Sequence, residues 1–481
     1  MAESDRKGPR IKTLLAMGAS LVLLYLGYTT DRPGDEAVMV ATVAGVAPTV
    51  STPLVQQAGT VAFVGVAVIP MDEERVVENQ TVLVSGGLVR QLGAADEVEV
   101  PGDAQVVDAR GLYLMPGLAE MHAHVPPGDR PAPGVLEDIM FLYLANGITT
   151  IRGMLGSDYQ LGLREELASG RMLGPTLYAA APSLNGNTAR TPEEAEERIR
   201  DYAGAGYDLL KIHPGITLPV WDHMAAVASE VGITFSGHVP ADVGLLHALE
   251  TGQSTVDHLD GMLEASVSAE VRARSEGGEN VPMEEVLASI DDDGIAAAVR
   301  ATREAGAWVV PTSYLWMNLL SPVNVDSMLA LPEMKYVSQR QRDGWRNQKN
   351  NSGSQPAEVA RRIVEVRDRI LAEANRQGLG ILMGTDSPQL FNVPGFALHR
   401  EIRFMERAGM TPFEILASGT RNVARYVGED LGQASNFGVI APGNRADLVL
   451  LEANPLESLD ALTRRAGVMV RGRWIPGPDL E

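Results

Sequence analysis

Between residues 113 and 437, short apolar runs alternate with longer stretches in which polar and apolar residues are mixed. Each run is mainly apolar and continuous, without the alternation of a strand that faces water on one side, as expected for a strand covered on both faces. A mixed stretch such as "TPEEAEERIRDYAGAG", with a threonine cap, an acidic first turn and closing glycines, is typical of a helix. The eight apolar runs are "LMPGLAEMHAH", "GITTIRGM", "PTLYAAAP", "YDLLKIHP", "GITFSGHVP", "STVDHLDG", "GAWVVPTS" and "LGILMGTDSP". Eight strands with intervening helices predict an α/β fold, the (β/α)8 TIM barrel.

The two ends of the chain share a different pattern. Residues 58–112 and 438–481 contain valine-rich runs broken by glycines and charged residues, which is typical of β-hairpins. They predict one β-sandwich domain formed from both ends of the chain, with the barrel inserted between them. Residues 313–377 are too long for a plain connection between a strand and a helix, so we expect a lid-like insertion there. Within it, "WRNQKNNSGSQ" predicts a mobile polar loop.

The first 57 residues are predicted to direct export and then to form a linker. Basic residues precede an uncharged run at residues 13–28, and acidic residues follow it. This order is typical of an export signal or a signal anchor. We therefore expect an exported protein, periplasmic or otherwise extracytoplasmic. Cleavage of the signal and membrane anchoring through residues 13–28 both stay open.

Composition excludes several classes of site and partner. The formal net charge is -22, which argues against nucleic acids and anionic membrane surfaces because phosphate binding needs clustered cations. The chain has no cysteine, so disulfides, thiolate ligands and a cysteine nucleophile are excluded. Any metal site must therefore use histidine, aspartate, glutamate or a modified side chain.

Side chains able to bind metal stand at the ends of the predicted barrel strands. His122 and His124 end the first strand, where alternate residues point to the same face. The fourth, fifth, sixth and eighth strands end near Lys211, His238, His258 and Asp386. Catalytic groups of a TIM barrel come from the C-terminal ends of its strands, so these residues are expected to converge. The set predicts a site for two metal ions.

Lysine is the unusual member of this set, because an ammonium group cannot bind a cation. Lys211 would contribute if it reacted with CO₂ to form a carbamate, an anion able to bridge two metal ions. Burial lowers the pKa of a lysine and so supplies the neutral amine that this reaction needs. The chain has 5 lysines, and Lys211 is the only one between residues 13 and 334. A buried salt bridge is the alternative role for Lys211.

Three residues near the predicted strand ends are candidates for proton transfer or substrate binding. Asp386 is able both to bind metal and to take a proton from an attacking water. Arg152, at the second strand end, has two alternatives of equal weight: binding a substrate carboxylate, or an ion pair inside the barrel. His213 follows Lys211 by two residues, just before Pro214 ends the strand, and is a candidate for substrate binding.

The motifs "GLAEMHAH", "DLLKIH", "SGHVP", "TVDHLDG" and "MGTDSP", followed by "GVIAPGNRADLVLLEANP", resemble the amidohydrolase superfamily. Within it the chain is most similar to the branch of imidazolonepropionase-like and Xaa-Pro dipeptidase (prolidase)-like enzymes. The resemblance covers residue 60 to the C-terminus and implies the barrel with its β-sandwich. It also implies two metal ions, with a hydroxide between them that attacks a carbonyl. The implied ligands are His122, His124 and Asp386 for one ion, His238 and His258 for the other, and carboxylated Lys211 as the bridge.

We therefore expect a binuclear metal-dependent hydrolase that cleaves an amide C–N bond in a small molecule, as a dipeptidase or an N-acyl amino acid hydrolase does. Hydrolysis of a cyclic amide, lactone or ester by the same groups is the alternative. A catalytically silent binding protein, anchored at the surface, is a third hypothesis. Such a protein would lack one or more of the metal-binding residues, and none is missing from this sequence. Zn²⁺ suits the ligand set, and Mn²⁺, Co²⁺ or Ni²⁺ would also fit. The sequence leaves the substrate and any homo-oligomer open.

Overall fold

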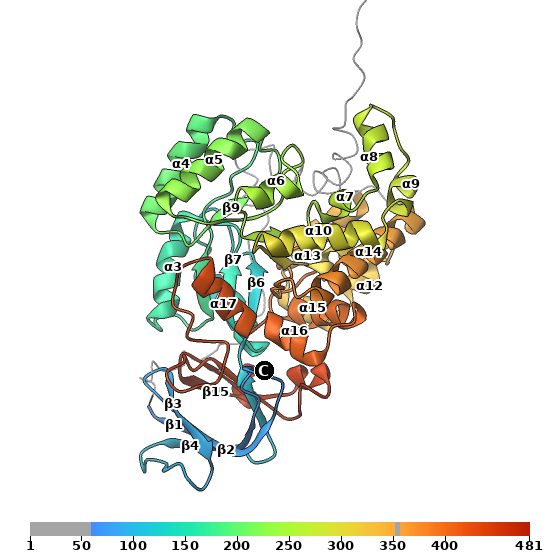
Figure 1. The fold of residues 1–481 in the computed structure, drawn as a ribbon. Helices are drawn as coiled ribbons and strands as arrows, with labels where there is room; N and C mark the ends of the chain where they lie inside the picture. Colours follow the sequence, from blue (N-terminus) through green and yellow to red (C-terminus); the bar gives the residue numbers. More distant parts are fainter. Residues whose placement is uncertain (1–58, 352–355) are drawn as a thin grey trace, which may run out of the picture.

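The structure is a computed structural model that describes residues 59–351 and 356–481. The predicted export segment, residues 1–57, lies outside the described residues. Among the helices of the described part, none combines the length and the apolar character needed to cross a bilayer. Figure 1 shows a β-sheet region at one end of the molecule and the helix-rich region above it.

Strands from both ends of the chain come together, as the sequence predicted, and they form one sheet. Its eight strands are β1 (Val61–Val68), β2 (Val77–Ser85), β3 (Leu88–Ala94), β4 (Gln105–Asp108), β5 (Tyr113–Pro116), β13 (Leu448–Leu451), β14 (Arg465–Val470) and β15 (Arg473–Pro476). They run in the order β15-β14-β13-β5-β1-β2-β3, with β4 beside β1. The two ends meet where β13 pairs antiparallel with β5. All eight belong to one hydrogen-bonded sheet, where we predicted a two-sheet sandwich, and the domain boundaries stay a prediction.

The inserted middle contains two sheets of parallel strands. The first has β6 (Leu118–Ala123), β7 (Ile148–Gly153) and β8 (Thr176–Ala179); the second has β9 (Leu210–Ile212), β10 (Phe235–Gly237), β11 (Thr255–Asp257) and β12 (Trp308–Val310). A parallel bridge from Ala180 to Leu209 links β8 to β9. At the eighth predicted strand, parallel bridges join Ile381 to Val309 and Ser387 to Ala123. This eighth segment is extended but too sparsely hydrogen-bonded to form a regular strand.

Helices follow the parallel strands and pack around them (Figure 1). They are α2 (Val135–Ala145), α3 (Asp158–Ala168), α4 (Pro192–Ala205), α5 (Leu218–Val231), α6 (Leu245–Glu250), α7 (Met262–Ala265), α8 (Ala269–Glu276), α9 (Met283–Ala288), α10 (Asp292–Glu304), α15 (Phe396–Arg407), α16 (Pro412–Ser418) and α17 (Arg421–Glu429). The predicted helix "TPEEAEERIRDYAGAG" is α4. Its cap, Thr191, accepts a hydrogen bond from the backbone of Glu194, and Gly206 ends it in a left-handed conformation.

The described residues of the insertion at 313–377 are largely helical, which corrects the predicted mobile loop at residues 345–351; the rest of that loop, residues 352–355, lies outside the described residues. It contains α11 (Ser313–Leu320), α12 (Val325–Leu329), the 3-10 helix η2 (Pro332–Tyr336), α13 (Gln339–Asn351) and α14 (Ala357–Arg376). The first seven residues of "WRNQKNNSGSQ" lie in α13, because Trp345 is buried and fastens the helix to a small apolar cluster. That cluster includes Leu315, Met334 and Phe391, so Trp345 belongs to the insertion's own core.

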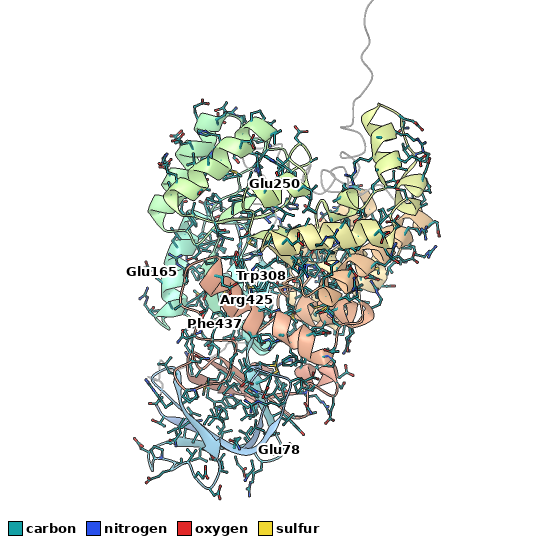
Figure 2. The ribbon with its side chains drawn as sticks, viewed as in Figure 1. Glu78, Glu165, Glu250, Trp308, Arg425 and Phe437 are labelled. Carbon is teal, nitrogen blue, oxygen red and sulfur yellow. The ribbon has the colours of Figure 1, made fainter. Side chains whose placement is uncertain are left out.

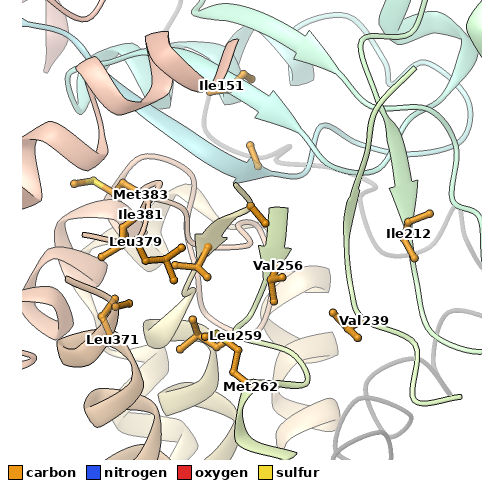
Figure 3. Close-up of a cluster of buried hydrophobic side chains, with 14 of the residues drawn as sticks. Ile151, Ile212, Val239, Val256, Leu259, Met262, Leu371, Leu379, Ile381 and Met383 are labelled. Carbon is orange, nitrogen blue, oxygen red and sulfur yellow. The ribbon is translucent and has the colours of Figure 1, made fainter. Parts of the chain in front are cut away.

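Apolar packing covers the parallel strands on the side facing α17. Trp308, Tyr426 and Phe437 belong to one buried cluster there. The guanidinium of Arg425 lies 5.2 Å from the centroid of the Trp308 ring, and Figure 2 labels both residues. Figure 3 shows another cluster around the strands, with Ile212 and Val256 among its members. This packing leaves the polar residues at the strand ends to form the site.

Candidate metal centre

Three of the predicted ligands form a compact buried group. His122, His258 and Asp386 each offer one ligand atom, and these atoms lie within 4.8 Å of one another. His122 lies in β6, His258 directly follows β11, and Asp386 follows the extended eighth segment. Three strand ends far apart in the sequence therefore place their side chains at one point.

The other three predicted ligands surround this group. The Nε2 atom of His124 lies 2.6 Å from Oδ1 of Asp386. The Nζ atom of Lys211 lies 3.3 Å from Nε2 of His122. The ring centroids of His238 and His258 are 4.5 Å apart. All the side chains that we predicted from strand ends therefore meet, although their individual metal roles stay a prediction.

The backbone at the site is held in unusual conformations. His258 has a φ of 63°, Asp386 of 64° and Thr312 of 47°, in the left-handed region that residues with a Cβ seldom adopt. Such conformations cost about 1–3 kcal/mol each and persist where the surrounding structure enforces them. Here they turn side chains at the strand ends toward the common centre.

Oxygen atoms lie close to the Nδ1 atoms of three imidazoles, and for His238 and His258 the contact is a hydrogen bond. The Nδ1 atom of His238 lies 2.6 Å from Oδ2 of Asp260, and that of His258 lies 2.8 Å from Oγ1 of Thr312. The Nδ1 atom of His122 lies 3.0 Å from Oδ2 of Asp257. A carboxylate oxygen facing Nδ1 favours a proton there and leaves the Nε2 lone pair free for a cation, and the hydroxyl of Thr312 is able to accept from Nδ1 in the same way.

The donor set fits divalent metal ions. In the described part of the chain, the Nε2 atom of His258 is buried without a hydrogen-bond partner, which is costly unless a ligand occupies that position. Burial lowers the pKa of His122 and of His258 well below the ordinary value, so both imidazoles are neutral. Burial also lowers the pKa of Lys211, although Asp257 and Asp386 act in the opposite direction. Neutral imidazoles beside a carboxylate are suitable ligands for Zn²⁺ and related ions.

Sequence reasoning missed several residues that support the ligands. Asp257 and Asp260 flank His258 in "TVDHLDG", so the signal was present but was not used. Gln389 donates from Nε2 to Oδ1 of Asp386 at 2.6 Å. For Gln389 and Thr312 no signal existed, because only the fold brings them to the site.

The side chain of Arg152 lies inside the protein, among buried partners. Its side chain is fully buried and lies 3.2 Å from Oδ1 of Asp257. It also donates to the backbone oxygen of Met121 at 2.7 Å and to the hydroxyl of Tyr426 at 2.9 Å. These contacts engage every nitrogen of the guanidinium and favour the internal ion pair, while substrate binding by Arg152 stays a prediction.

His213 lies beside the ligands. Its ring centroid is 5.1 Å from that of His238, and its Nδ1 atom is 2.6 Å from Oγ of Ser183. The side chain is buried but reaches the same space as His238. Substrate binding by His213 therefore stays a prediction, compatible with its position.

Glu120 joins the first strand end to the eighth and was also missed. It is fully buried and accepts hydrogen bonds from the backbone of His122 and from both the backbone and the hydroxyl of Thr385. Burial raises the pKa of Glu120 to about 8. These bonds fix the segment that carries Asp386 against the strand that carries His122.

Glu401 gives a pH-dependent prediction for stability. It accepts hydrogen bonds from the backbone N–H groups of Ser313 and Tyr314, at 2.8 and 2.7 Å, where α11 begins directly after Thr312. Burial raises its pKa from 4.5 to about 7, so folding favours the protonated acid. Its contribution is fully present below pH 4.5 and is lost as the pH rises through 7, by about 3 kcal/mol in total.

We expect Glu401→Gln to remove this part of the pH dependence. Denaturant unfolding at a series of pH values from 4 to 8 measures it, as the difference in unfolding free energy between the two proteins. The wild-type protein should lose stability relative to Glu401→Gln as the pH rises. A difference that stays constant across the series would contradict the assigned pKa.

The chain is similar to known hydrolases in sequence and in fold. Residues 113–475 match the Amidohydrolase family. The chain is 31% identical over 112 residues to an enamidase from Eubacterium barkeri, covering 22% of this chain and 29% of the relative. It is 38% identical over 111 residues to an ochratoxinase from Aspergillus niger, covering 22% of each. These matches span less than a third of either relative.

The fold has a wider match. A solved structure of a candidate prolidase from Bifidobacterium longum superposes with a TM-score of 0.64 at 23% identity, covering 87% of this chain and 95% of that one. At this identity the likeness concerns the fold alone. The family match covers both the parallel strands and the strands of the sheet that follow them. The chain therefore belongs to the amidohydrolase family, and its fold is shared with the prolidase-like branch of that superfamily.

Proposed function

We propose that this protein is a binuclear metal-dependent hydrolase that cleaves an amide C–N bond, with dipeptides and N-acyl amino acids as its substrate class. The observation that carries the proposal is the buried group of His122, His258 and Asp386, whose ligand atoms lie within 4.8 Å. An enclosed set of neutral imidazoles and a carboxylate has a high cost unless cations stabilise it. Family membership supports the same conclusion.

Each residue of the group has an assigned role in this proposal. His122, His124 and Asp386 would hold one ion, His238 and His258 would hold the second, and Lys211, once carboxylated, would supply an anionic ligand to both. Zn²⁺ is the first candidate for both ions. When bound, the two ions lower the pKa of water and polarise the scissile carbonyl.

Asp386 moves the proton in this reaction. Its Oδ1 atom accepts a hydrogen bond from Gln389 and lies 2.6 Å from Nε2 of His124, so the carboxylate is held in one orientation. From there it would take a proton from the attacking water and deliver it to the leaving nitrogen. Asp257 and Asp260 orient His122 and His238 and take no direct part.

The proposal includes a closed eight-stranded barrel and export of the protein. The bridges that link β8 to β9, and the eighth segment to both β12 and β6, support closure of the parallel strands into the eight-stranded barrel. Export is supported only by the charge pattern around residues 13–28. To test export, the protein is recovered from separate compartments of a producing cell. Mass spectrometry then identifies the compartment that contains the protein and the first residue of the recovered chain.

A panel of substrates tests the proposed activity. Full-length protein, reconstituted with Zn²⁺ and bicarbonate, is offered N-acyl amino acids and dipeptides beside lactones, cyclic amides and esters. We expect hydrolysis of linear amides, its loss after treatment with a chelator, and its return with Zn²⁺. Turnover of lactones, cyclic amides or esters without linear amides would contradict the substrate class. Hydrolysis that survives complete removal of metal would contradict the mechanism.

A further inference from the structure

The imidazole of His213 has one engaged nitrogen and one free nitrogen. Its Nδ1 atom lies 2.6 Å from Oγ of Ser183. Its Nε2 atom has no hydrogen-bond partner among the described residues. It is not sealed from solvent. The ring lies against that of His238, with centroids 5.1 Å apart. The free nitrogen is therefore accessible at the side of the site where His238 lies.

A chain of hydrogen bonds in the loop after β8 determines which nitrogen of His213 carries the proton. The chain starts at Asn185, whose Oδ1 atom accepts from the backbone N–H of Asn187 at 2.8 Å and of Thr188 at 3.2 Å. A backbone N–H only donates, so the atom facing these groups is the amide oxygen of Asn185. Its Nδ2 group consequently faces Ser183 and donates to Oγ at 2.9 Å.

Ser183 passes this orientation on to His213. Its hydroxyl oxygen already accepts from Asn185, and in the described part of the chain His213 is the other partner of that hydroxyl. The single hydroxyl hydrogen is therefore available to Nδ1 of His213, which acts as the acceptor. When Nδ1 accepts, the proton of a neutral imidazole is on Nε2. His213 thus presents an N–H donor to the site.

We propose that this Nε2–H group of His213 donates a hydrogen bond to the carbonyl oxygen of the scissile amide, and that Ser183 and Asn185 are positioning residues that fix its tautomer. The assignment rests on the proposed function of the site. A neutral donor suits an oxygen that gains negative charge only as the carbonyl is attacked. The rings of His238 and His258, the proposed ligands of the second ion, lie 4.5 Å apart, and the ring of His213 lies against that of His238, so the donor is beside that ion's ligands. Arg152, whose guanidinium is occupied by Asp257, does not compete for this oxygen.

The tautomer is measured directly, without any substrate. The full-length Zn²⁺-loaded protein is labelled with ¹⁵N-histidine, and two-bond ¹H–¹⁵N correlations report which ring nitrogen is protonated. Loss of one spin system in His213→Gln assigns its signals. We expect protonation at Nε2 in the wild-type protein and a mixture of tautomers in Ser183→Ala. Protonation at Nδ1 in the wild-type protein would overturn the proposed chain of hydrogen bonds.

Kinetics on a linear amide tests the role of the donor. His213→Phe, which lacks a donor, should lower kcat about 100-fold and leave KM nearly unchanged, as expected when a donor acts mainly in the transition state. His213→Gln should recover part of kcat, because its amide N–H is able to reach the same oxygen. Ser183→Ala should lower kcat about 10-fold, as is common for residues that orient a catalytic group. His223→Gln, on the surface of α5 beside Glu196, is the matched control and should keep the wild-type kcat.

Metal content separates this role from a structural one, so zinc per chain is measured for every variant. We expect wild-type zinc in His213→Phe together with its low kcat. A wild-type kcat in His213→Phe, a change confined to KM, or a loss of zinc that accounts for the lower rate would each overturn this assignment alone. Absence of amide hydrolysis by the wild-type protein would overturn the proposed function and this assignment together.

Discussion

Lys211→Ala should lose bound metal, and its rate of amide hydrolysis should fall at least about 10³-fold, because two ions would no longer share an anionic bridge. The Nζ atom lies 3.3 Å from Nε2 of His122, so the side chain ends where the metal ligands meet. Zinc content and kcat are measured on the same preparation. A short carboxylic acid such as acetate or propionate should restore part of both, since its carboxylate fits the place of the carbamate.

Lys335→Ala is the matched control for this variant. Lys335 is exposed in the insertion and its ammonium lies over the ring of Tyr336, so its removal should change neither zinc content nor rate. The alternative role of Lys211 is a salt bridge to Asp257, whose Oδ2 atom lies 4.0 Å away. Full metal and full rate in Lys211→Ala would rule out the bridge and favour the salt bridge.

Asp386→Asn should lower kcat at least about 10³-fold, because the amide neither takes up the proton of the attacking water nor provides the charge of a carboxylate ligand. The substitution keeps the size of the side chain and allows Gln389 to keep its hydrogen bond to Oδ1. Steady-state kinetics with zinc measured in parallel tests this expectation.

The control for Asp386→Asn is a carboxylate that also pairs with a histidine but lies outside the site. Asp222 is exposed and accepts from Nε2 of His247 at 2.6 Å. Asp222→Asn should leave kcat unchanged. If Asp386→Asn kept a kcat within a few-fold of the wild-type value, Asp386 would not be the group that moves the proton.

The candidate ligands could be predicted because the barrel pattern carries their geometry. In parallel strands with helical connections, every strand ends on the same side, so polar residues at strand ends meet whatever their separation in sequence. His122 and Asp386 are far apart in the chain, yet this rule places them together. The eighth segment, around Ile381, obeys the rule although it forms only isolated bridges.

The residues that the sequence did not reveal are those whose role depends on side-chain packing. Arg152 fits a strand end as well as any ligand, and only its contact with Asp257 assigns it to the interior. Thr312 reaches His258 because the chain turns there in a left-handed conformation that no pattern indicated. Trp345 lies in a polar stretch that favours a loop, but the burial of its indole stabilises a helix.

The proposed mechanism requires that the strand ends hold two metal ions. Elemental analysis of the full-length protein, purified without chelators, tests it most directly. We predict close to two transition-metal ions per chain, with zinc as the main metal, in protein that hydrolyses linear amides. One ion per chain, or none after reconstitution with Zn²⁺ and bicarbonate, would contradict the paired site and the mechanism built on it.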